Sequence, residues 1–327
     1  FLDGNPKGIH IGQTTLDKFE SKDNNVQVIN DGRLRQKALI EGSISTLNIQ
    51  RSQSVKEENS ICPPFVGNKI LTSRELPVDK ICNYLDRKAL FASQWQLKKT
   101  RDQSKKEYDD FITRKAEPIL EDLIAKSKAE NLLEPAVSYG YYPCGRKGNS
   151  LIVFSPEDLS EILCEFTLPR QKSGSRYCIA DFFRDIDEGK PTDYLPMQAV
   201  TMGVSASRYS QELFSKNRYT DYLYFHGFAV QMAEALAEMI HARIRQENAF
   251  EKEGELDIKD ILSLKYRGCR YSFGYPACPE VSESRKQINI LKTNLIGLTM
   301  DESDQFHPEQ STTALVALHP QAKYFGI

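Results

Sequence analysis

The stretch Arg270-Tyr-Ser-Phe-Gly-Tyr-Pro-Ala-Cys-Pro-Glu280 combines a fixed cation, three aromatic rings, a glycine and two prolines. Pro276 and Pro279 lock φ and supply no backbone donor, and Gly274 permits backbone conformations that other residues avoid. A regular helix and a central strand are therefore both excluded. The composition predicts a rigid, irregular loop that presents a cation and several rings, namely Arg270, Tyr271, Phe273 and Tyr275. The alternative is a structural corner with core rings and a surface arginine, because loops more often connect than catalyse.

The segments around this loop alternate between helical and extended patterns. Residues 225–248 carry an apolar stripe at helical spacing, and residues 105–130 form a charged amphipathic pattern. Apolar runs bounded by turn residues predict strands. They fall at residues 137–142, 151–154, 162–168, 177–183, 195–202, 298–300, 314–319 and 323–325, with a basic loop at 143–149. This mixture predicts an α+β fold with a largely antiparallel, twisted sheet flanked by helices.

The N-terminal part of the chain differs in composition from the rest. Residues 1–60 are rich in Asn, Gln, Ser, Lys and Asp and show no sustained period. They predict a linker or loosely ordered arm, with residues 51–60 as the flexible joint and residues 61–327 as the folded domain. Early in that domain, Asp79 is the expected N-cap of a helix, which places Asp86 at or just past the helix end. Trp95, the only tryptophan, is expected in the core.

Composition argues against several classes of partner. With 43 Lys and Arg against 45 Asp and Glu, the formal charge is -2, which gives no electrostatic case for nucleic acid or an acidic membrane surface. The seven cysteines are scattered without a C-x-x-C pair and predict reduced thiols rather than disulfides or a zinc site. No apolar run reaches membrane-spanning length, so we expect a soluble, cytoplasmic protein. Because the chain opens on Phe1 rather than methionine, an excised portion of a longer protein is one interpretation.

The sequence contains no pattern that predicts a nucleophile, a general base or a metal site. It has no phosphate-binding GxxxxGK[ST] or GxGxxG pattern, and residues 203–207 lack the closing glycine of a serine-hydrolase elbow. The helix at 225–248 carries a polar row at steps of three and four residues, made of Glu234, Glu238, His241 and Arg245. Such a row is usually intrahelical pairing. Because His241 has no HExxH-like companion, we expect neither a bound metal nor a catalytic residue.

The pattern RxxxGYPACPE at residues 270–280 resembles the signature of the activation domain of cobalamin-dependent methionine synthase, the module that binds S-adenosylmethionine. Other stretches are similar to the same family and occur in the same order. They are PPF (63–65), YLDRKALFASQWQL (84–97), GYYPC (140–144), CIADFF (178–183), MAEALAEMIHARIR (232–245) and AKYFGI (322–327). The resemblance covers residues 61–327 and does not reach the N-terminal arm.

The resemblance implies a binding site for S-adenosylmethionine and places four side chains in it. A guanidinium suits the carboxylate of this ligand through paired hydrogen bonds, and the motif match makes Arg270 the candidate. Aromatic faces suit the sulfonium and the adenine. The matched rings are those of Tyr275, Tyr324 and Phe325.

Three further residues complete the implied site. An acid suits an amine or a ribose hydroxyl, and the resemblance gives this role to Asp86. Irregular backbone around Ser272 would read the adenine edge, and Glu234 is expected as an auxiliary. The chain departs from the family at Phe325, where some relatives carry tyrosine, and at Val281, where some carry histidine. Contacts made through a phenol hydroxyl or an imidazole at those positions would be missing.

The reaction implied by the family is the reductive reactivation of methionine synthase. Its cobalamin, held by another domain or chain, occasionally oxidises to inactive cob(II)alamin. An electron from flavodoxin or a related flavoprotein reductase, followed by methyl transfer from S-adenosylmethionine, restores methylcobalamin. The task of this chain would be orientation, since the nucleophile belongs to the cofactor.

By itself the chain is not expected to make methionine. It lacks the Asp-x-His-x-x-Gly cobalamin motif and a cysteine cluster for zinc, so we expect it to act as the activation module of a methyltransferase. Two alternatives stay open. One is a stand-alone S-adenosylmethionine-binding accessory or sensor for another cobalamin protein, and the other is an independent methyltransferase.

Overall fold

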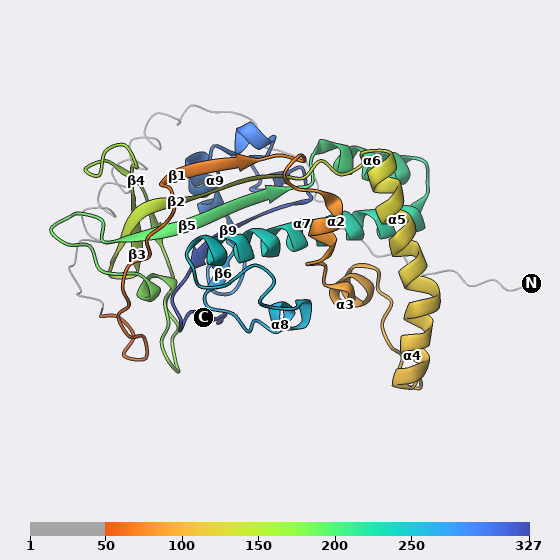
Figure 1. Cartoon of the computed structure of the whole chain (residues 1–327), viewed down its shortest axis with the longest axis horizontal. Helices are drawn as coiled ribbons and strands as arrows, with labels where there is room; N and C mark the ends of the chain where they lie inside the picture. Colours follow the sequence, from red (N-terminus) through yellow and green to blue (C-terminus); the bar gives the residue numbers. More distant parts are fainter. Residues whose placement is uncertain (1–49) are drawn as a thin grey trace, which may run out of the picture. The chain divides into compact units, whose positions relative to one another are not determined.

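A helix of 29 residues, α7 (Tyr219–Glu247), packs on one face of a seven-stranded sheet (Figure 1). The computed structural model describes residues 50–327. Within them, every strand pair of the large sheet is antiparallel. The Gln198 amide donates to the carbonyl of Ala237 at 2.9 Å and so ties the sheet to the middle of α7. The predicted α+β class with an antiparallel sheet is confirmed.

Six strands of the large sheet follow one path, and the seventh joins the path at its longest member. The path runs β4 (Ile162–Thr167), β3 (Ser150–Phe154), β2 (Ala136–Lys147), β5 (Asp193–Thr201), β9 (Ser311–Ala317) and β6 (Cys269–Tyr271), and β1 (Gly67–Leu71) pairs with β2. Strands β1 and β3 share one edge of β2, where β1 pairs with residues 137–141 and β3 with residues 144–147. Strand β6 lies at the end of the path, so the loop that follows it leaves from the edge of the sheet.

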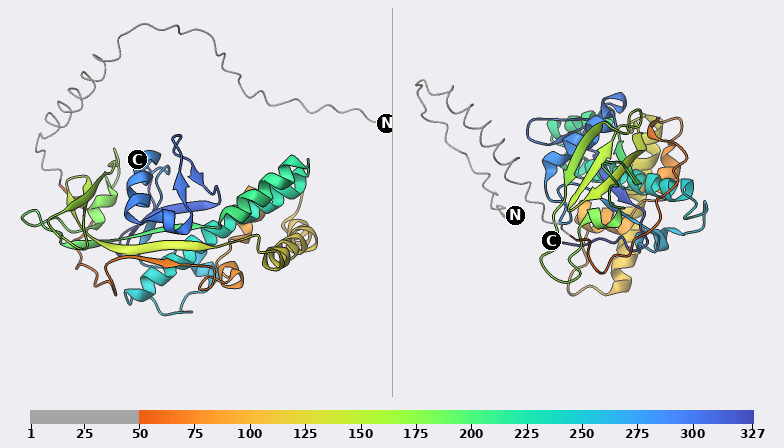
Figure 2. Two further views of the ribbon diagram at one scale, coloured as in Figure 1. Left: turned by 90° about the horizontal axis from the view of Figure 1, so that it is seen from above. Right: turned by 90° about the vertical axis from the view of Figure 1, so that its left-hand side faces the viewer.

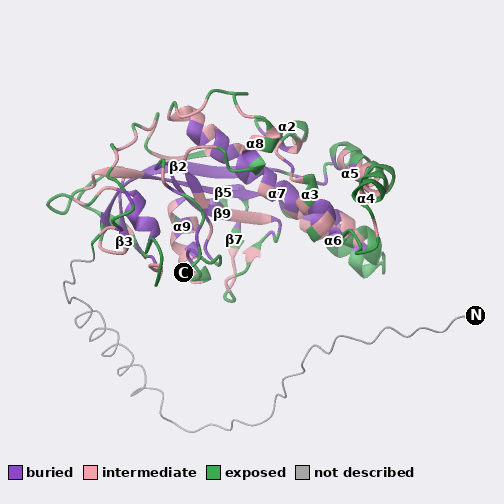
Figure 3. Cartoon of the chain, turned by 90° about the horizontal axis from the view of Figure 1, so that it is seen from below, coloured by how far each residue is buried: buried purple, intermediate pink, exposed green. Residues whose placement is uncertain are grey.

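Alternate side chains of the strands contribute to two hydrophobic cores, one on each face of the sheet. Tyr139 and Tyr141 of β2 point into the core shared with α7. Tyr142 and Cys144 point into the opposite core, where the hydroxyl of Tyr142 bonds the carbonyl of Ile290 at 3.0 Å. Burial on both faces explains why β2 and β5 consist almost entirely of buried residues (Figure 3).

The remaining helices are shorter, and one of them, α9 (Ser284–Ile290), packs against the face of the sheet opposite to α7. They are α2 (Val78–Cys82), α3 (Arg87–Ala89), α4 (Lys105–Phe111), α5 (Glu117–Ala129), α6 (Val204–Ser215), α8 (Ile258–Leu262) and α9 (Ser284–Ile290), with a small hairpin of β7 (Thr299–Met300) and β8 (Phe306–His307). Helices α4 and α5, joined by a π-helical turn at Ile112–Ala116, lie at the end opposite to β3 and β4 (Figure 2). No helix in the described range is long and apolar enough to span a bilayer.

Most predicted elements agree with the structure. The long helix begins six residues earlier than expected, at Tyr219. The strands predicted at 162–168, 195–202 and 314–319 are present as β4, β5 and β9. The 105–130 pattern forms α4 and α5, and Trp95 is buried as expected.

Four local predictions are wrong. The basic loop at 143–149 is mostly strand, because Arg146 bonds Asp185 at 2.5 Å and the chain turns only after Lys147. Residues 177–183 form a 3₁₀ turn instead of a strand, since the Asp181 carboxylate accepts from the Cys178 N–H at 3.1 Å. Residues 323–325 form no strand. The helix expected to be capped by Asp79 begins at Val78, after the extended Pro77.

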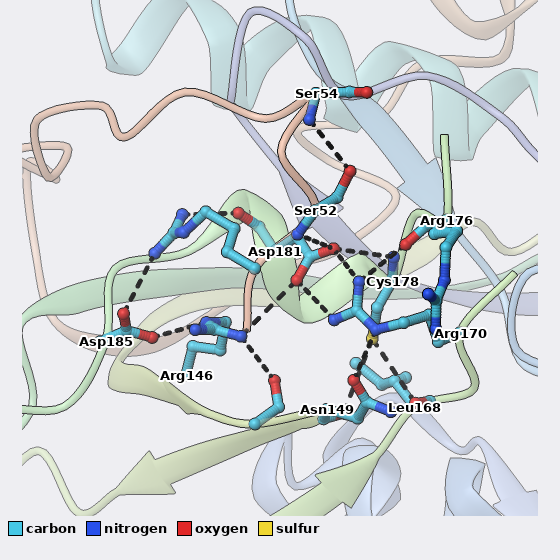
Figure 4. A network of polar contacts seen from close by, with 12 residues as sticks. Ser52, Ser54, Arg146, Asn149, Leu168, Arg170, Arg176, Cys178, Asp181 and Asp185 are labelled. Carbon is cyan, nitrogen blue, oxygen red and sulfur yellow. Dashed lines mark hydrogen bonds and ion pairs between the residues drawn. The ribbon is translucent and has the colours of Figure 1, made fainter. Parts of the chain in front are cut away.

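Residues 51–60 pack on the folded body, contrary to the predicted flexible joint. Figure 4 shows the buried carboxylate of Asp181 at the centre of this contact. It accepts from the Ser52 N–H at 3.3 Å and from Arg170 at 2.6 and 2.7 Å. Val55 is also buried in the second core. The predicted arm character of residues 1–49 falls outside the described residues and stays a prediction.

Candidate functional site

The loop that follows β6 closes into a tight turn. The Gly274 N–H donates to the carbonyl of Cys278, and the Cys278 N–H donates to the carbonyl of Tyr275, both at 2.9 Å. Gly274 has φ +90°, a conformation that favours glycine. The turn leaves the side chain of Tyr275 53% exposed while Phe273 stays buried. Both interpretations of the motif therefore hold in part, since some of its rings are core and one faces solvent.

Strand alternation sends Arg270 and Tyr271 to opposite faces of the sheet. Arg270 is paired with Val316 of β9, a member of the core that contains α7, whereas Tyr271 is paired with Leu315 of the other core. The side chain of Arg270 is 22% exposed, and its Nη2 lies 2.9 Å from Oε2 of Glu238 on α7. The cation of the motif is thus held at the sheet edge beside the long helix.

Glu238 is the buried acid of this site. Burial alone would raise the pKa of its carboxyl, but Arg270, with His241 and Arg245, lowers that pKa to about 2. Its Oε1 lies 3.6 Å from Nη1 of Arg245. The hydroxyl of Tyr266 donates to its Oε2 at 3.3 Å. The carboxylate therefore stays charged at neutral pH and is surrounded by cations and donors.

Glu234 brings α7 to the motif loop one turn before Glu238. Its negative charge is the main cause that raises the pKa of the Tyr275 hydroxyl, and it also acts on the guanidinium of Arg270. Tyr324 is 46% exposed. Burial raises the pKa of its hydroxyl, as do Cys278 and Tyr275 nearby. Four of the predicted residues, Arg270, Glu234, Tyr275 and Tyr324, are therefore brought together.

The segment that carries Tyr324 is fastened by side chains rather than by strand pairing. The hydroxyl of Tyr271 donates to the carbonyl of Lys323 at 2.8 Å, and the Gln171 amide donates to the carbonyl of Gly326 at 2.7 Å. Phe325 is buried and its ring lies 5.9 Å from that of Tyr271. The structure thus places Phe325 in the core beneath the site, where it anchors the segment.

Two predicted residues lie elsewhere or contribute only backbone. Asp86 caps α3 by accepting from the Ala89 N–H at 2.9 Å, and no described contact joins it to Arg270. The carbonyl of Ser272 accepts from the Cys278 thiol at 3.0 Å, which ties it into the turn. Sequence reasoning does not identify Glu238 as the partner of Arg270, or Tyr266 as a donor to Glu238. The available signal is the four-residue spacing from Glu234 to Glu238, which places both acids on one face of the helix, whereas the polar row by itself predicts pairing within the helix.

The site combines one guanidinium, two carboxylates and two exposed phenol rings. A guanidinium at the surface recognises a carboxylate, and rings beside a carboxylate suit a cation. Among residues 50–327, no group of three or more His, Cys, Asp or Glu side chains is arranged to hold a metal ion. The arrangement therefore fits the binding of a small molecule that carries both a carboxylate and a cationic group.

The chain is similar to several known proteins. A profile described as "Vitamin B12 dependent methionine synthase, activation domain" matches residues 77–327. The methionine synthases of Mycobacterium tuberculosis (strain ATCC 25618 / H37Rv) and Mycobacterium leprae (strain TN) are each 38% identical to this chain over 289 residues. These matches cover 85% of this chain and 24% of each relative, so the chain spans about a quarter of the length of these curated relatives.

A solved structure shares the fold. The crystal structure of the MetH reactivation domain bound to AdoHcy is 23% identical and matches with a TM-score of 0.72, over 82% of this chain and 83% of that chain. The profile match includes α7, the motif loop and every strand of the large sheet except β1. The chain belongs to the activation-domain family of vitamin B12-dependent methionine synthases.

Proposed function

We propose that this chain binds S-adenosylmethionine at the edge of its sheet and presents the methyl group for reactivation of the cobalamin of methionine synthase. The observation that carries the proposal is the Arg270 guanidinium, held by Glu238 at 2.9 Å next to the exposed ring of Tyr275. Family membership supports the proposal. Further support comes from the solved reactivation domain, which was crystallised with AdoHcy, the ligand without its methyl group.

The groups of the ligand match the residues of the site. The carboxylate would pair with Arg270, whose fork of N–H donors is only partly used by described residues. The sulfonium would lie near the faces of Tyr275 and Tyr324, where the negative charge of Glu234 also favours a cation. Bound S-adenosylmethionine supplies an electrophilic methyl group, and the residues of the chain bind and orient it.

The remaining site predictions have weaker support. Asp86 would need to turn from its cap toward the ligand, and Ser272 would contribute its backbone. Phe325 would act through the position of Tyr324, because its own ring is buried. These three assignments stay predictions.

The partners are proposed from the family. Cobalamin would be held by another domain or chain, and flavodoxin or a related flavoprotein reductase would supply the electron. The chain itself would act as the activation module, so methionine formation is not expected from it alone. An accessory or sensor protein and an independent methyltransferase would bind the same ligand, and the methyl acceptor distinguishes them from a reactivation module.

Calorimetric titration of S-adenosylmethionine into the purified chain tests the proposal. We expect saturable binding, and we expect Arg270→Ala to weaken it by about 1.5 to 3 kcal/mol, the usual contribution of a charge-assisted hydrogen bond. Arg285→Ala is the matched control, because Arg285 pairs with Asp304 and contacts none of the site residues. No binding by a well-folded chain, or equal affinity of the Arg270 variant, would contradict the proposal.

A second measurement tests the methyl acceptor. The chain would be mixed with a cobalamin-loaded domain of methionine synthase, reduced flavodoxin and S-adenosylmethionine, and the absorbance of the cobalamin followed. The module is expected to accelerate formation of methylcobalamin, and the Arg270 variant to lose that acceleration. Binding without any effect on cobalamin would favour the sensor.

A further inference from the structure

Arg270, the proposed partner of the ligand carboxylate, belongs to a largely buried cluster of two acids and two arginines. Glu238 pairs with Arg270 at 2.9 Å, and Glu251 pairs with Arg245 at 2.6 Å. The two halves meet where Oε1 of Glu238 lies 3.6 Å from Nη1 of Arg245. Two negative charges balance two positive ones, so the cluster is neutral as a whole.

Of the four charged side chains, only Arg270 is substantially open to solvent. Its side chain is 22% exposed, against 9% for Glu238, 6% for Glu251 and 0% for Arg245. A guanidinium has five N–H donors in a fixed plane, and described residues bond one of them. Glu238 therefore holds the inner side of the fork and leaves the outer donors for a ligand.

Glu238 is itself held in place from two sides. The Tyr266 hydroxyl donates to Oε2, the same oxygen that accepts from Arg270. The ring of Tyr266 in turn lies 3.9 Å under the guanidinium of Arg245. These neighbours restrict the movement of the Glu238 carboxylate, which accepts from Arg270.

The neighbouring acid makes this restriction necessary. Glu234 lies one turn earlier on α7, and its charge also acts on Arg270. If Glu238 were absent, Glu234 would be the remaining carboxylate that acts on Arg270. We expect the guanidinium then to leave the position in which its outer donors face a ligand carboxylate.

We propose that Glu238 is a positioning residue, which aims the Arg270 guanidinium at the carboxylate of the bound ligand. The proposal rests on the proposed function. It differs from a purely structural role in one respect. It requires Glu238 to matter for ligands that carry the carboxylate and not for ligands that lack it.

The test uses calorimetry to compare the affinities of two ligands for the parent chain and for matched variants. AdoHcy carries the carboxylate and the amine, whereas decarboxylated AdoHcy keeps the thioether, the nucleoside and the amine and lacks only the carboxylate. Glu238→Gln should weaken the binding of AdoHcy by at least roughly tenfold and leave that of decarboxylated AdoHcy within about twofold, because only a carboxylate uses the aimed guanidinium.

Glu251→Gln is the matched control. It makes the same chemical change in the same buried cluster but on the acid that pairs with Arg245 and not with Arg270. We expect the affinity of this variant for each ligand to stay within about twofold of that of the parent, since the orientation of the Arg270 guanidinium is unchanged.

The outcomes separate the inference from the function beneath it. If Glu238→Gln weakens the binding of both ligands equally, or does not weaken the binding of AdoHcy, the positioning role is overturned while the proposed function stands. A parent chain that binds neither ligand overturns the proposed function and the positioning role with it. If Glu238→Gln does not fold, Tyr266→Phe removes the hydroxyl that fixes Glu238. Tyr266→Phe should weaken the binding of AdoHcy by roughly two- to fivefold and leave the binding of the other ligand unchanged. An equal effect on the binding of both ligands overturns the inference.

Discussion

The hydroxyl of Tyr271 donates to the carbonyl of Lys323 at 2.8 Å, so the strand that presents Arg270 on one face holds the C-terminal segment on the other. The next residue along that segment is Tyr324, one of the exposed rings of the site. Strand β6 therefore fixes both a cation and an aromatic ring of the proposed ligand site.

Tyr271→Phe should release the C-terminal segment. The loss of one hydrogen bond should cost about 1 kcal/mol of unfolding free energy and speed amide exchange in residues 323–327. Tyr142→Phe is the control, because its hydroxyl makes a similar bond to Ile290 away from that segment. Hydrogen exchange read by mass spectrometry distinguishes the two, and equal protection of the C-terminal segment in both variants would count against the tether.

Tyr275 should act through its ring face. Its side chain is 53% exposed, and its hydroxyl makes no hydrogen bond to a described residue. We expect Tyr275→Phe to change S-adenosylmethionine affinity little and Tyr275→Ala to lose about 1 to 2 kcal/mol, the scale of a cation–π contact. Titration of both variants decides the point. Equal losses would show that the hydroxyl carries the contact.

His241 should make the fold sensitive to mild acid. Burial lowers the pKa of its imidazole from 6.5 to about 4, next to Glu238, Arg245, Arg270 and the ring of Tyr266. Between those pH values the unfolded chain binds a proton that the folded chain does not, so stability falls as pH falls. The loss across that window is on the order of 2 to 3 kcal/mol.

His241→Phe keeps a ring against Tyr266 and removes the titration. The variant should lose less stability than the parent between about pH 7 and about pH 4.5, as measured by urea unfolding followed through the buried Trp95. Below that window the parent and the variant should both weaken further, because Glu238 has a pKa of about 2 and its stabilising charge is lost as the pH falls toward that value. Identical slopes for parent and variant above about pH 4.5 would show that His241 does not titrate as proposed.

Asp181→Ala should be among the most destabilising single changes. The carboxylate is fully buried and accepts two bonds from Arg170, at 2.6 and 2.7 Å, and one from the Ser52 N–H. Removing it leaves a nearly buried guanidinium without its partner, at a cost of about 3 to 5 kcal/mol. Asp187→Ala, at an exposed position on the same loop, should stay within about 0.5 kcal/mol of the parent. Thermal unfolding of the two variants checks the difference.

Much of the fold follows from local pattern. Helix α7 and strands β4, β5 and β9 were predictable because their apolar residues repeat at the spacing of a helix or fill a buried strand. The errors fall where a distant partner decides. Local sequence predicts a loop around Arg146, but its ion pair with Asp185 allows it to lie in a strand. Local sequence also predicts a strand at residues 177–183, but the Asp181 side chain bonds the Cys178 N–H and stabilises a 3₁₀ turn.

The motif residues were recognisable for the same reason that they form a turn. Gly274 and the flanking prolines fix the backbone by themselves, so Arg270 and Tyr275 could be predicted as presented groups. The burial of Phe325 and the capping role of Asp86 could not, since both depend on what packs against them.

The sequence by itself determined the α+β class, the irregular loop after residue 270 and the family to which the chain belongs. Each of these rests on residue type and local spacing. Only the tertiary structure decided that Glu238, 32 positions before Arg270, holds its guanidinium. Only the tertiary structure decided that Tyr271 ties down Lys323, 52 positions later. Contacts over such distances depend on how β6 packs against α7 and the C-terminal segment, and no local pattern encodes that packing.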